Sequence, residues 1–189
     1  MTIRKLSVET EDQLGLFRDI KRSISIAIFG SFYENRKEDL IKLRDFLRDN
    51  GYLGAKISED LDDRSLEERC DDDPIRNREL SKRLIMECDI HIFVIVRRHD
   101  GEPDNLILSV AMELERMSVL DEFQIKLCPF IAIYSEHGLI ETTGSVFKGL
   151  IHEKIDDWDI EEFEHIEDIF KPCRAFCHRS IHSIYYGNR

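Results

Sequence analysis

Several features are missing from this sequence, and each absence excludes a class of protein. No stretch approaches the roughly 18 consecutive apolar residues that a membrane-spanning helix requires. Acidic residues, not an apolar segment, follow the first five residues, so a secretory signal is not expected. The chain also contains no internal repeat and no low-complexity tract. We therefore expect a cytoplasmic globular protein without a membrane segment.

Regular cysteine spacing and excess positive charge are also missing. The five cysteines are odd in number and scattered, which is typical of free thiols in the cytoplasm rather than of a disulfide framework. Acidic residues outnumber basic ones by 39 to 27, which gives a net charge of −12. Such a surface repels phosphate backbones, so a role in coating DNA or RNA is not expected. A small anionic nucleotide is still compatible with this charge, because local amides and arginines decide its binding.

Neither of the standard phosphate-binding motifs occurs, since the chain has no G-x-G-x-x-G and no Walker pattern. The 189 residues are enough for one well-buried core and short for two. We therefore expect one domain at residues 23–171, preceded by a helical extension at 1–22. A C-terminal helical segment of the same domain is expected at 172–189.

Apolar runs alternate with helical patterns along the chain. We expect strands at residues 23–30, 54–57, 91–96, 126–134 and, with weaker periodicity, 152–158. We expect helices at residues 10–21, 36–50, 78–88, 105–117, 160–170 and 173–184. Asn50-Gly51 predicts a left-handed helix end, and Pro172 is expected to bend or end the helix before it. This alternation predicts an α/β fold, a flavodoxin-like three-layer sandwich with a mainly parallel sheet of about five strands.

The first candidate site is the turn Gly30-Ser31-Phe32, where the first apolar run stops. In open α/β sheets, ligands bind at the carboxyl ends of the strands. Gly30 permits a close backbone approach, the Ser31 hydroxyl can bond a phosphate or ribose oxygen, and Phe32 can stack on a base. The alternative is a tight turn between strand and helix that holds no ligand.

The second candidate is Glu113, on the helix expected at 105–117. It lies at the border of the apolar face, one turn after Ser109. A carboxylate at such a border can be half-desolvated, which raises its pKa and makes it a usable nucleophile or acid/base. The alternative is a solvated glutamate on the surface of the helix.

These residues together resemble the nucleoside 2-deoxyribosyltransferase-like superfamily, which is structurally related to TIR domains. The similarity rests on residues 28–32, on Asp100-Gly101 after a buried strand, and on residues 109–114. The resemblance implies that Glu113 attacks or stabilises the sugar C1′ as an N-glycosidic bond breaks. It also implies that the turn at Gly30 holds the nucleotide and that Asp100 lies near the sugar or base. Residues 107–110 differ from the transferase pattern, so hydrolysis, or binding without turnover, is an alternative to transfer.

Two further groups of residues contain side chains that bind ligands in other proteins. Arg97 and Arg98 could clamp a phosphate, although paired arginines at a strand end are more often solvated or ion-paired. The segment 173–182 resembles a zinc site superficially, but its two cysteines and two histidines point in different directions on one helix. We therefore expect buried thiols beside surface histidines, no metal and no cofactor.

Two functions from different classes follow. The first is an enzyme that cleaves or transfers the N-glycosidic bond of a nucleoside or nucleotide. The second is a non-catalytic nucleotide-sensing module, or a TIR-like module that binds another protein. The apolar segment 181–186 is expected to pack on its own domain or on a second copy, which would form a homodimer.

Overall fold

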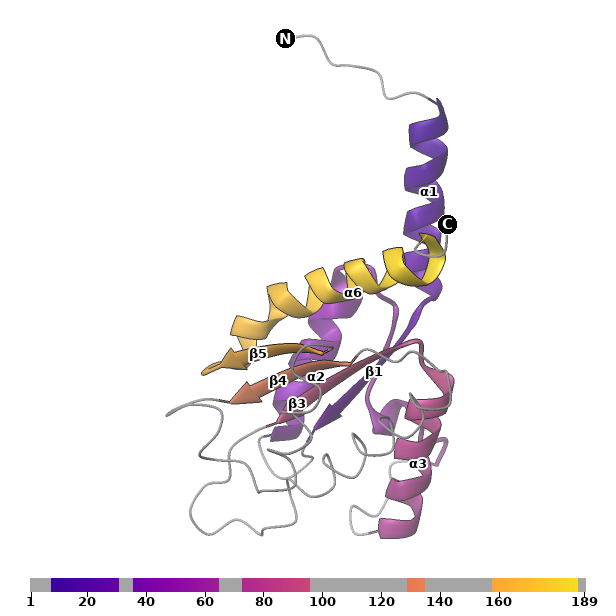
Figure 1. The fold of residues 1–189 in the computed structure, drawn as a ribbon. Helices are drawn as coiled ribbons and strands as arrows, with labels where there is room; N and C mark the ends of the chain where they lie inside the picture. The colour runs from indigo at the N-terminus through magenta and orange to yellow at the C-terminus, as the bar shows by residue number, and fades with distance from the viewer. Residues whose placement is uncertain (1–7, 31–35, 65–72, 96–128, 135–157, 187–189) are drawn as a thin grey trace.

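The computed structural model describes residues 8–30, 36–64, 73–95, 129–134 and 158–186 (Figure 1). They form one five-stranded sheet with the strand order β2-β1-β3-β4-β5. The strands are β1 (Ser25–Gly30), β2 (Gly54–Lys56), β3 (Ile90–Ile95), β4 (Phe130–Tyr134) and β5 (Asp159–Phe163). Every neighbouring pair is parallel. The predicted flavodoxin-like α/β fold is confirmed.

Helices cover both faces of this sheet (Figure 1). They are α1 (Val8–Ser23), α2 (Arg36–Asp49), α3 (Pro74–Glu87) and α6 (Phe170–Tyr186), with short 3₁₀ turns η1 (Ser58–Leu61) and η2 (Ile166–Ile169). One apolar cluster joins the sheet to α1, α2 and α6, and a second joins it to α3. Among the described residues, no helix combines the length and the apolar character needed to cross a bilayer.

The central strand β1 shows why the sheet lies between two helical layers. Ile26 and Ile28 belong to the cluster beneath α2 and α6, whereas Ala27 and Phe29 belong to the cluster beneath α3. All four side chains are buried. Burial of a large apolar side chain stabilises the fold by about 1.5–3 kcal/mol, so a continuous apolar run favours a strand that is covered on both faces.

The end of α2 has the geometry that Asn50-Gly51 predicts. Gly51 adopts a φ of 90°, a left-handed conformation that glycine enters without a steric penalty. Its N–H donates to the Arg48 carbonyl at 2.9 Å, and the Tyr52 N–H donates to the Leu47 carbonyl at 3.0 Å. These are the two hydrogen bonds of a Schellman motif, so the predicted helix end is confirmed.

The prediction that a helix begins near Ile160 was wrong, whereas the strand expected at 152–158 lies outside the described residues except for Trp158. The strand is β5 at Asp159–Phe163, where we expected the closing helix to begin near Ile160. Ile160 and Phe163 are three residues apart, a spacing that also fits one face of a helix. In β5 this odd spacing directs them to opposite faces, where Ile160 packs against one apolar cluster and Phe163 belongs to the other. Parallel pairing with β4 therefore decides the conformation.

Two predictions for helices that have a proline near their start were also wrong. Pro172 lies in the first turn of α6, which begins at Phe170 and continues to Tyr186 without the expected break. A first turn needs no N–H from that residue, so proline is tolerated there. The helix expected at 78–88 begins earlier, at Pro74, because the Asp73 side chain caps it by accepting the Arg76 N–H at 3.0 Å.

Candidate functional site

The strand order creates a switch point between β1 and β3. The chain passes from β1 to β2 on one side of the sheet, and later to β3 on the other side of β1. In open α/β sheets the ligand crevice lies where the connections diverge in this way, at the carboxyl ends of the strands. Gly30, the last residue of β1, pairs in register with Val94 near the end of β3. The segments that follow β1 and β3 therefore start from adjacent strand ends.

Only one of the predicted site residues belongs to the described part of the chain. Gly30 is described, and the others lie outside it: Ser31, Phe32, Arg97, Arg98, Asp100, Ser109 and Glu113. The proposed meeting of the Gly30 turn with Glu113 therefore stays a prediction.

Gly30 also has a packing role that requires no ligand. A Cβ atom at this position would lie 2.7 Å from Leu40 Cδ2 and 3.1 Å from the Val94 carbonyl oxygen. Leu40 belongs to α2 and is fully buried. The absence of a side chain at Gly30 thus lets α2 approach the end of β1 closely.

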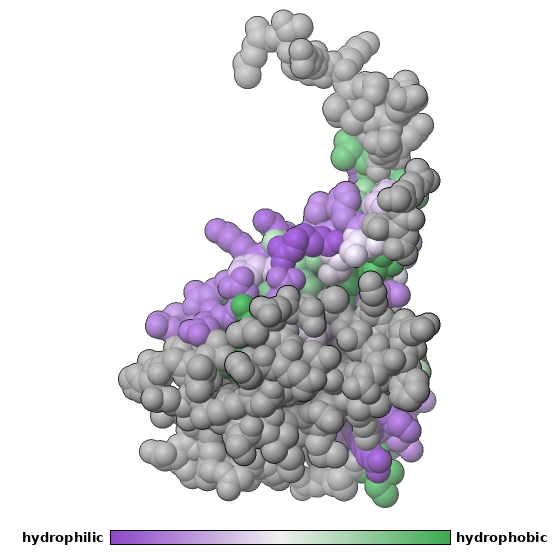
Figure 2. All heavy atoms as spheres, viewed as in Figure 1, coloured by the Kyte–Doolittle hydropathy of each residue, from purple (hydrophilic) through white to green (hydrophobic). Residues whose placement is uncertain are grey.

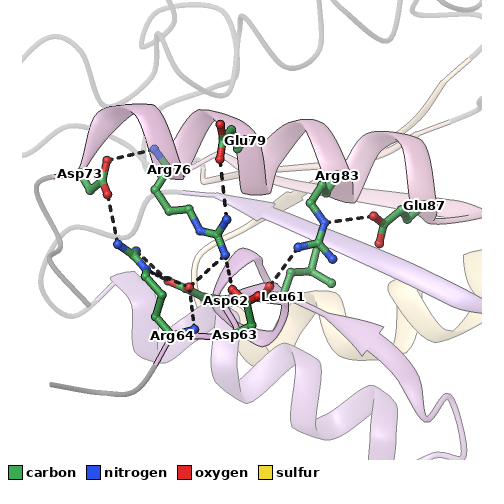
Figure 3. A network of polar contacts seen from close by, with 9 residues as sticks. All are labelled: Leu61, Asp62, Asp63, Arg64, Asp73, Arg76, Glu79, Arg83 and Glu87. Atoms are coloured by element: carbon green, nitrogen blue, oxygen red, sulfur yellow. Dashed lines mark hydrogen bonds and ion pairs between the residues drawn. The ribbon is translucent and has the colours of Figure 1, made fainter. Parts of the chain in front are cut away.

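A network of ion pairs lies beyond the end of β2, around η1 and the start of α3 (Figure 3). The buried carboxylate of Asp62 accepts hydrogen bonds from Arg64 Nη2 at 2.8 Å and from Arg76 Nη2 at 3.3 Å. Arg64 Nη1 also donates to Asp73 Oδ2 at 3.1 Å. The two ends of the segment 65–72 are thereby tied together, since Arg64 precedes it and Asp73 follows it.

The side chains of Asp62 and Arg64 in this network stay charged at neutral pH. The Arg64 side-chain hydrogen bonds hold the pKa of Asp62 well below its usual range, despite the opposing effect of burial. The same pairing with Asp62 raises the pKa of Arg64. Asp62 is therefore ionised at neutral pH and is not a general acid. Because Arg64 and Arg76 already bind carboxylates, neither is a free phosphate clamp.

The site predicted from the sequence does not include the residues of this network, although the sequence indicates one part of it. Asp73-Pro74 is a helix start, with an N-cap carboxylate and a proline at the first position. Asp62 and Arg64 lie in a polar stretch without periodicity, so their pairing with α3 has no sequence signal.

A comparison with known protein families finds no family model that matches this chain, and a comparison with curated proteins finds no match.

His91 is a buried titratable group on β3, but it belongs to the core. Its Nε2 lies 3.0 Å from the Ile85 carbonyl oxygen, and its ring stacks on Phe29 with 6.2 Å between centroids. Burial lowers the pKa of His91 to about 4, so the ring is neutral at physiological pH. It pairs in register with Ala27, away from the carboxyl edge.

The cysteines and histidines of α6 are arranged as the sequence indicates. Cys173 and Cys177 are fully buried, and burial raises the pKa of the Cys177 thiol to about 12. His178 and His182 are exposed, and their ring centroids lie 4.6 and 5.6 Å from that of Phe17. Within the described ranges, no group of three or more histidine, cysteine or acidic side chains is placed to hold a metal ion.

Proposed function

We propose that this protein binds a nucleoside or nucleotide at the carboxyl edge of its sheet and cleaves or transfers the N-glycosidic bond through Glu113. The observation that supports this most is the switch point between β1 and β3, where Gly30 pairs with Val94. Both candidate ligand-binding segments, the Gly30 turn and the stretch containing Asp100, follow these two neighbouring strands in the chain.

The roles of the side chains follow from the chemistry of the bond. The Glu113 carboxylate must approach C1′ to about 3–3.5 Å, where it attacks or stabilises the developing positive charge. A purine or pyrimidine base leaves more readily when an acid protonates it, and Asp100 would supply that proton. Nicotinamide leaves as a neutral molecule and needs no acid. The remaining ligand-binding side chains would be Ser31, Phe32, Arg97, Arg98 and Ser109.

A second function is favoured by two observations. Gly30 is explained by its contact with Leu40, and the described arginines near this edge are neutralised by carboxylates. Both features are compatible with a module that binds a nucleotide or another protein without chemistry. The resemblance to TIR domains supports the same alternative.

The two functions differ in whether base is released. The full chain is incubated with NAD and with a panel of deoxynucleosides, and free base is measured by chromatography. We expect release by the unaltered protein and a loss of at least about 100-fold in Glu113→Gln, because the reacting carboxylate is removed. Glu115→Gln is the matched control, since it removes the same charge on the same expected helix.

Two results would contradict the enzymatic proposal. Release that survives in Glu113→Gln would show that another group performs the chemistry. No release from any substrate would favour the binding module.

A further inference from the structure

A group of cations surrounds an open groove at the opposite edge of the sheet, beside the amino ends of the strands. The groove has a volume of about 460 Å³. It lies between the end of α1 and the end of α2, and its lining residues are Arg18, Lys21, Arg22, Asp49, Asn50, Gly51 and Leu53. Arg174 of α6 adjoins the groove, because its Nη1 donates to Asn50 Oδ1 at 3.0 Å.

Among the described residues, these cations have no carboxylate partner. Within the described part of the chain, Arg18, Lys21, Arg22 and Arg174 form no ion pair. Elsewhere, most described arginines bind a carboxylate, namely Arg44, Arg48, Arg64, Arg76, Arg83 and Arg179. Asp49 is the single carboxylate among the described lining residues. The groove therefore carries excess positive charge on a chain whose net charge is −12.

Lys21 contacts an aromatic ring beside the groove. Its ammonium lies 4.6 Å from the centroid of the Tyr52 ring. Burial and the nearby charge of Arg174 both lower the pKa of Lys21. Two cations that approach one another without a counter-charge are unfavourable, and a bound anion would relieve this repulsion.

Helix dipoles explain the positions of only some of these cations. Lys21 and Arg22 lie in the last turn of α1, where the dipole favours positive charge. Arg18 lies one turn earlier, and Arg174 lies near the start of α6, where the dipole favours negative charge instead. Arg174 is nevertheless bonded to Asn50 at the carboxyl end of α2, where the dipole favours positive charge. Arg18 has no such role, and a ligand would explain its placement.

We propose that this groove binds a small polyanion of the phosphate-ester or pyrophosphate class, at a site separate from the proposed nucleotide site. Its volume falls within the range of about 300–1,000 Å³ that is common for small-molecule sites. Arginine forks suit phosphate oxygens, and the exposed side chain of Leu53 offers an apolar wall. The length of β1 separates this groove from the carboxyl edge by roughly 17 Å.

The test measures binding of inorganic tripolyphosphate to the full chain by calorimetry at low ionic strength. We expect the double variant Arg18→Gln/Arg174→Gln to raise the Kd at least about tenfold, because two charge-assisted contacts are lost. The matched control is Arg78→Gln/Lys82→Gln on α3, which removes the same charge from cations that also lack ion pairs in the described structure. We expect the control to change the Kd by less than about twofold.

Two outcomes would overturn the proposal: no binding to the unaltered protein, or equal weakening in the control variant. Thermal unfolding verifies that each variant is folded, and Arg174→Gln alone provides a second variant with a smaller expected loss. Repeating the titration with ADP shows whether a base adds affinity to the phosphate chain. Glu113→Gln is expected to bind tripolyphosphate normally, so failure of this site and failure of the glycosidic function are distinguishable.

Discussion

At the scale of single residues, glycine has different structural roles at different positions of this chain. Gly30 lies at the carboxyl end of β1, where we propose a ligand site, and an added Cβ atom there would meet the side chain of Leu40. At Gly54 a Cβ atom would lie 2.1 Å from the carbonyl oxygen of Ile24. That neighbour is backbone and cannot rotate away. Gly15 on α1, in contrast, has nothing within 4 Å of an added Cβ atom.

Gly54→Ala and Gly15→Ala are therefore expected to change stability in opposite directions. Gly54→Ala should lower the free energy of unfolding by about 1–3 kcal/mol, because β1 and β2 must move apart. Gly15→Ala should raise it by about 0.5–1 kcal/mol, since alanine favours the helix. Urea unfolding measures both values. Equal effects of the two variants would contradict the close approach of Gly54 to Ile24.

His91 predicts a pH dependence of stability. Burial lowers its pKa to about 4 in the folded protein, whereas an unfolded histidine titrates near 6.5. Between these values the unfolded chain binds more protons, so the stabilising contribution is complete above about pH 6.5 and is lost as the pH falls toward 4. The full loss corresponds to about 3 kcal/mol.

Urea unfolding between pH 7 and pH 4.5 measures this loss. His91→Phe is expected to flatten the pH dependence in this window, and the exposed His165→Gln serves as the control. An unchanged slope in His91→Phe would contradict the assignment of the effect to this ring.

At the scale of elements, α3 depends on contacts at its first turn. Asp73 caps the helix through the Arg76 N–H and also binds Arg64 (Figure 3). Further along α3, Arg83 donates to the Leu61 carbonyl at 3.3 Å. These contacts join α3 to the turn η1, which follows β2.

Asp73→Ala is expected to lower the free energy of unfolding by about 1–2 kcal/mol, because the cap is lost. Asp63→Ala is the control: Asp63 also pairs with an arginine, but its side chain is 83% exposed. Such exposed pairs contribute about 0–1 kcal/mol. Chemical denaturation compares the two variants. A larger loss in Asp63→Ala would show that the cap does not determine the stability of this helix start.

At the scale of the whole molecule, apolar side chains stay exposed near the crossing of α1 and α6. Leu14 and Leu16 on α1 are 51% and 55% exposed, and Tyr185 on α6 is 50% exposed. Figure 2 shows hydrophobic side chains near this crossing, above the hydrophilic outer face of α6. Within the segment 181–186, Ile181 is buried in its own domain, and self-association through the exposed end of that segment stays a prediction.

Light scattering after size-exclusion chromatography tests this prediction. We expect a dimer for the unaltered chain and a shift toward monomer for Leu16→Gln, because apolar contact area is lost. Ile75→Gln on α3 changes a side chain that is 74% exposed and should leave the mass unchanged. A monomeric unaltered chain would exclude self-association at the concentration used.

Much of the fold was predictable, because it depends on local pattern. The apolar run of β1 required cover on both faces, and Asn50-Gly51 required a helix end. Cys173 and Cys177 lie four residues apart on α6, a spacing that places them on one face of the helix, and that face is buried. Of the predicted site, only Gly30 falls within the described residues, so the rest of the site stays a prediction.

The sequence by itself determined which segments are strands or helices wherever periodicity was strong, since hydrogen bonding and burial there act over a few residues. Only the tertiary structure decided that Ile160 and Phe163 lie on a strand, because pairing with β4 outweighs their helix-like spacing. It also decided which charges meet. Asp62 binds Arg76, and Lys21 approaches Arg174, because the fold brings together residues that are far apart in the chain.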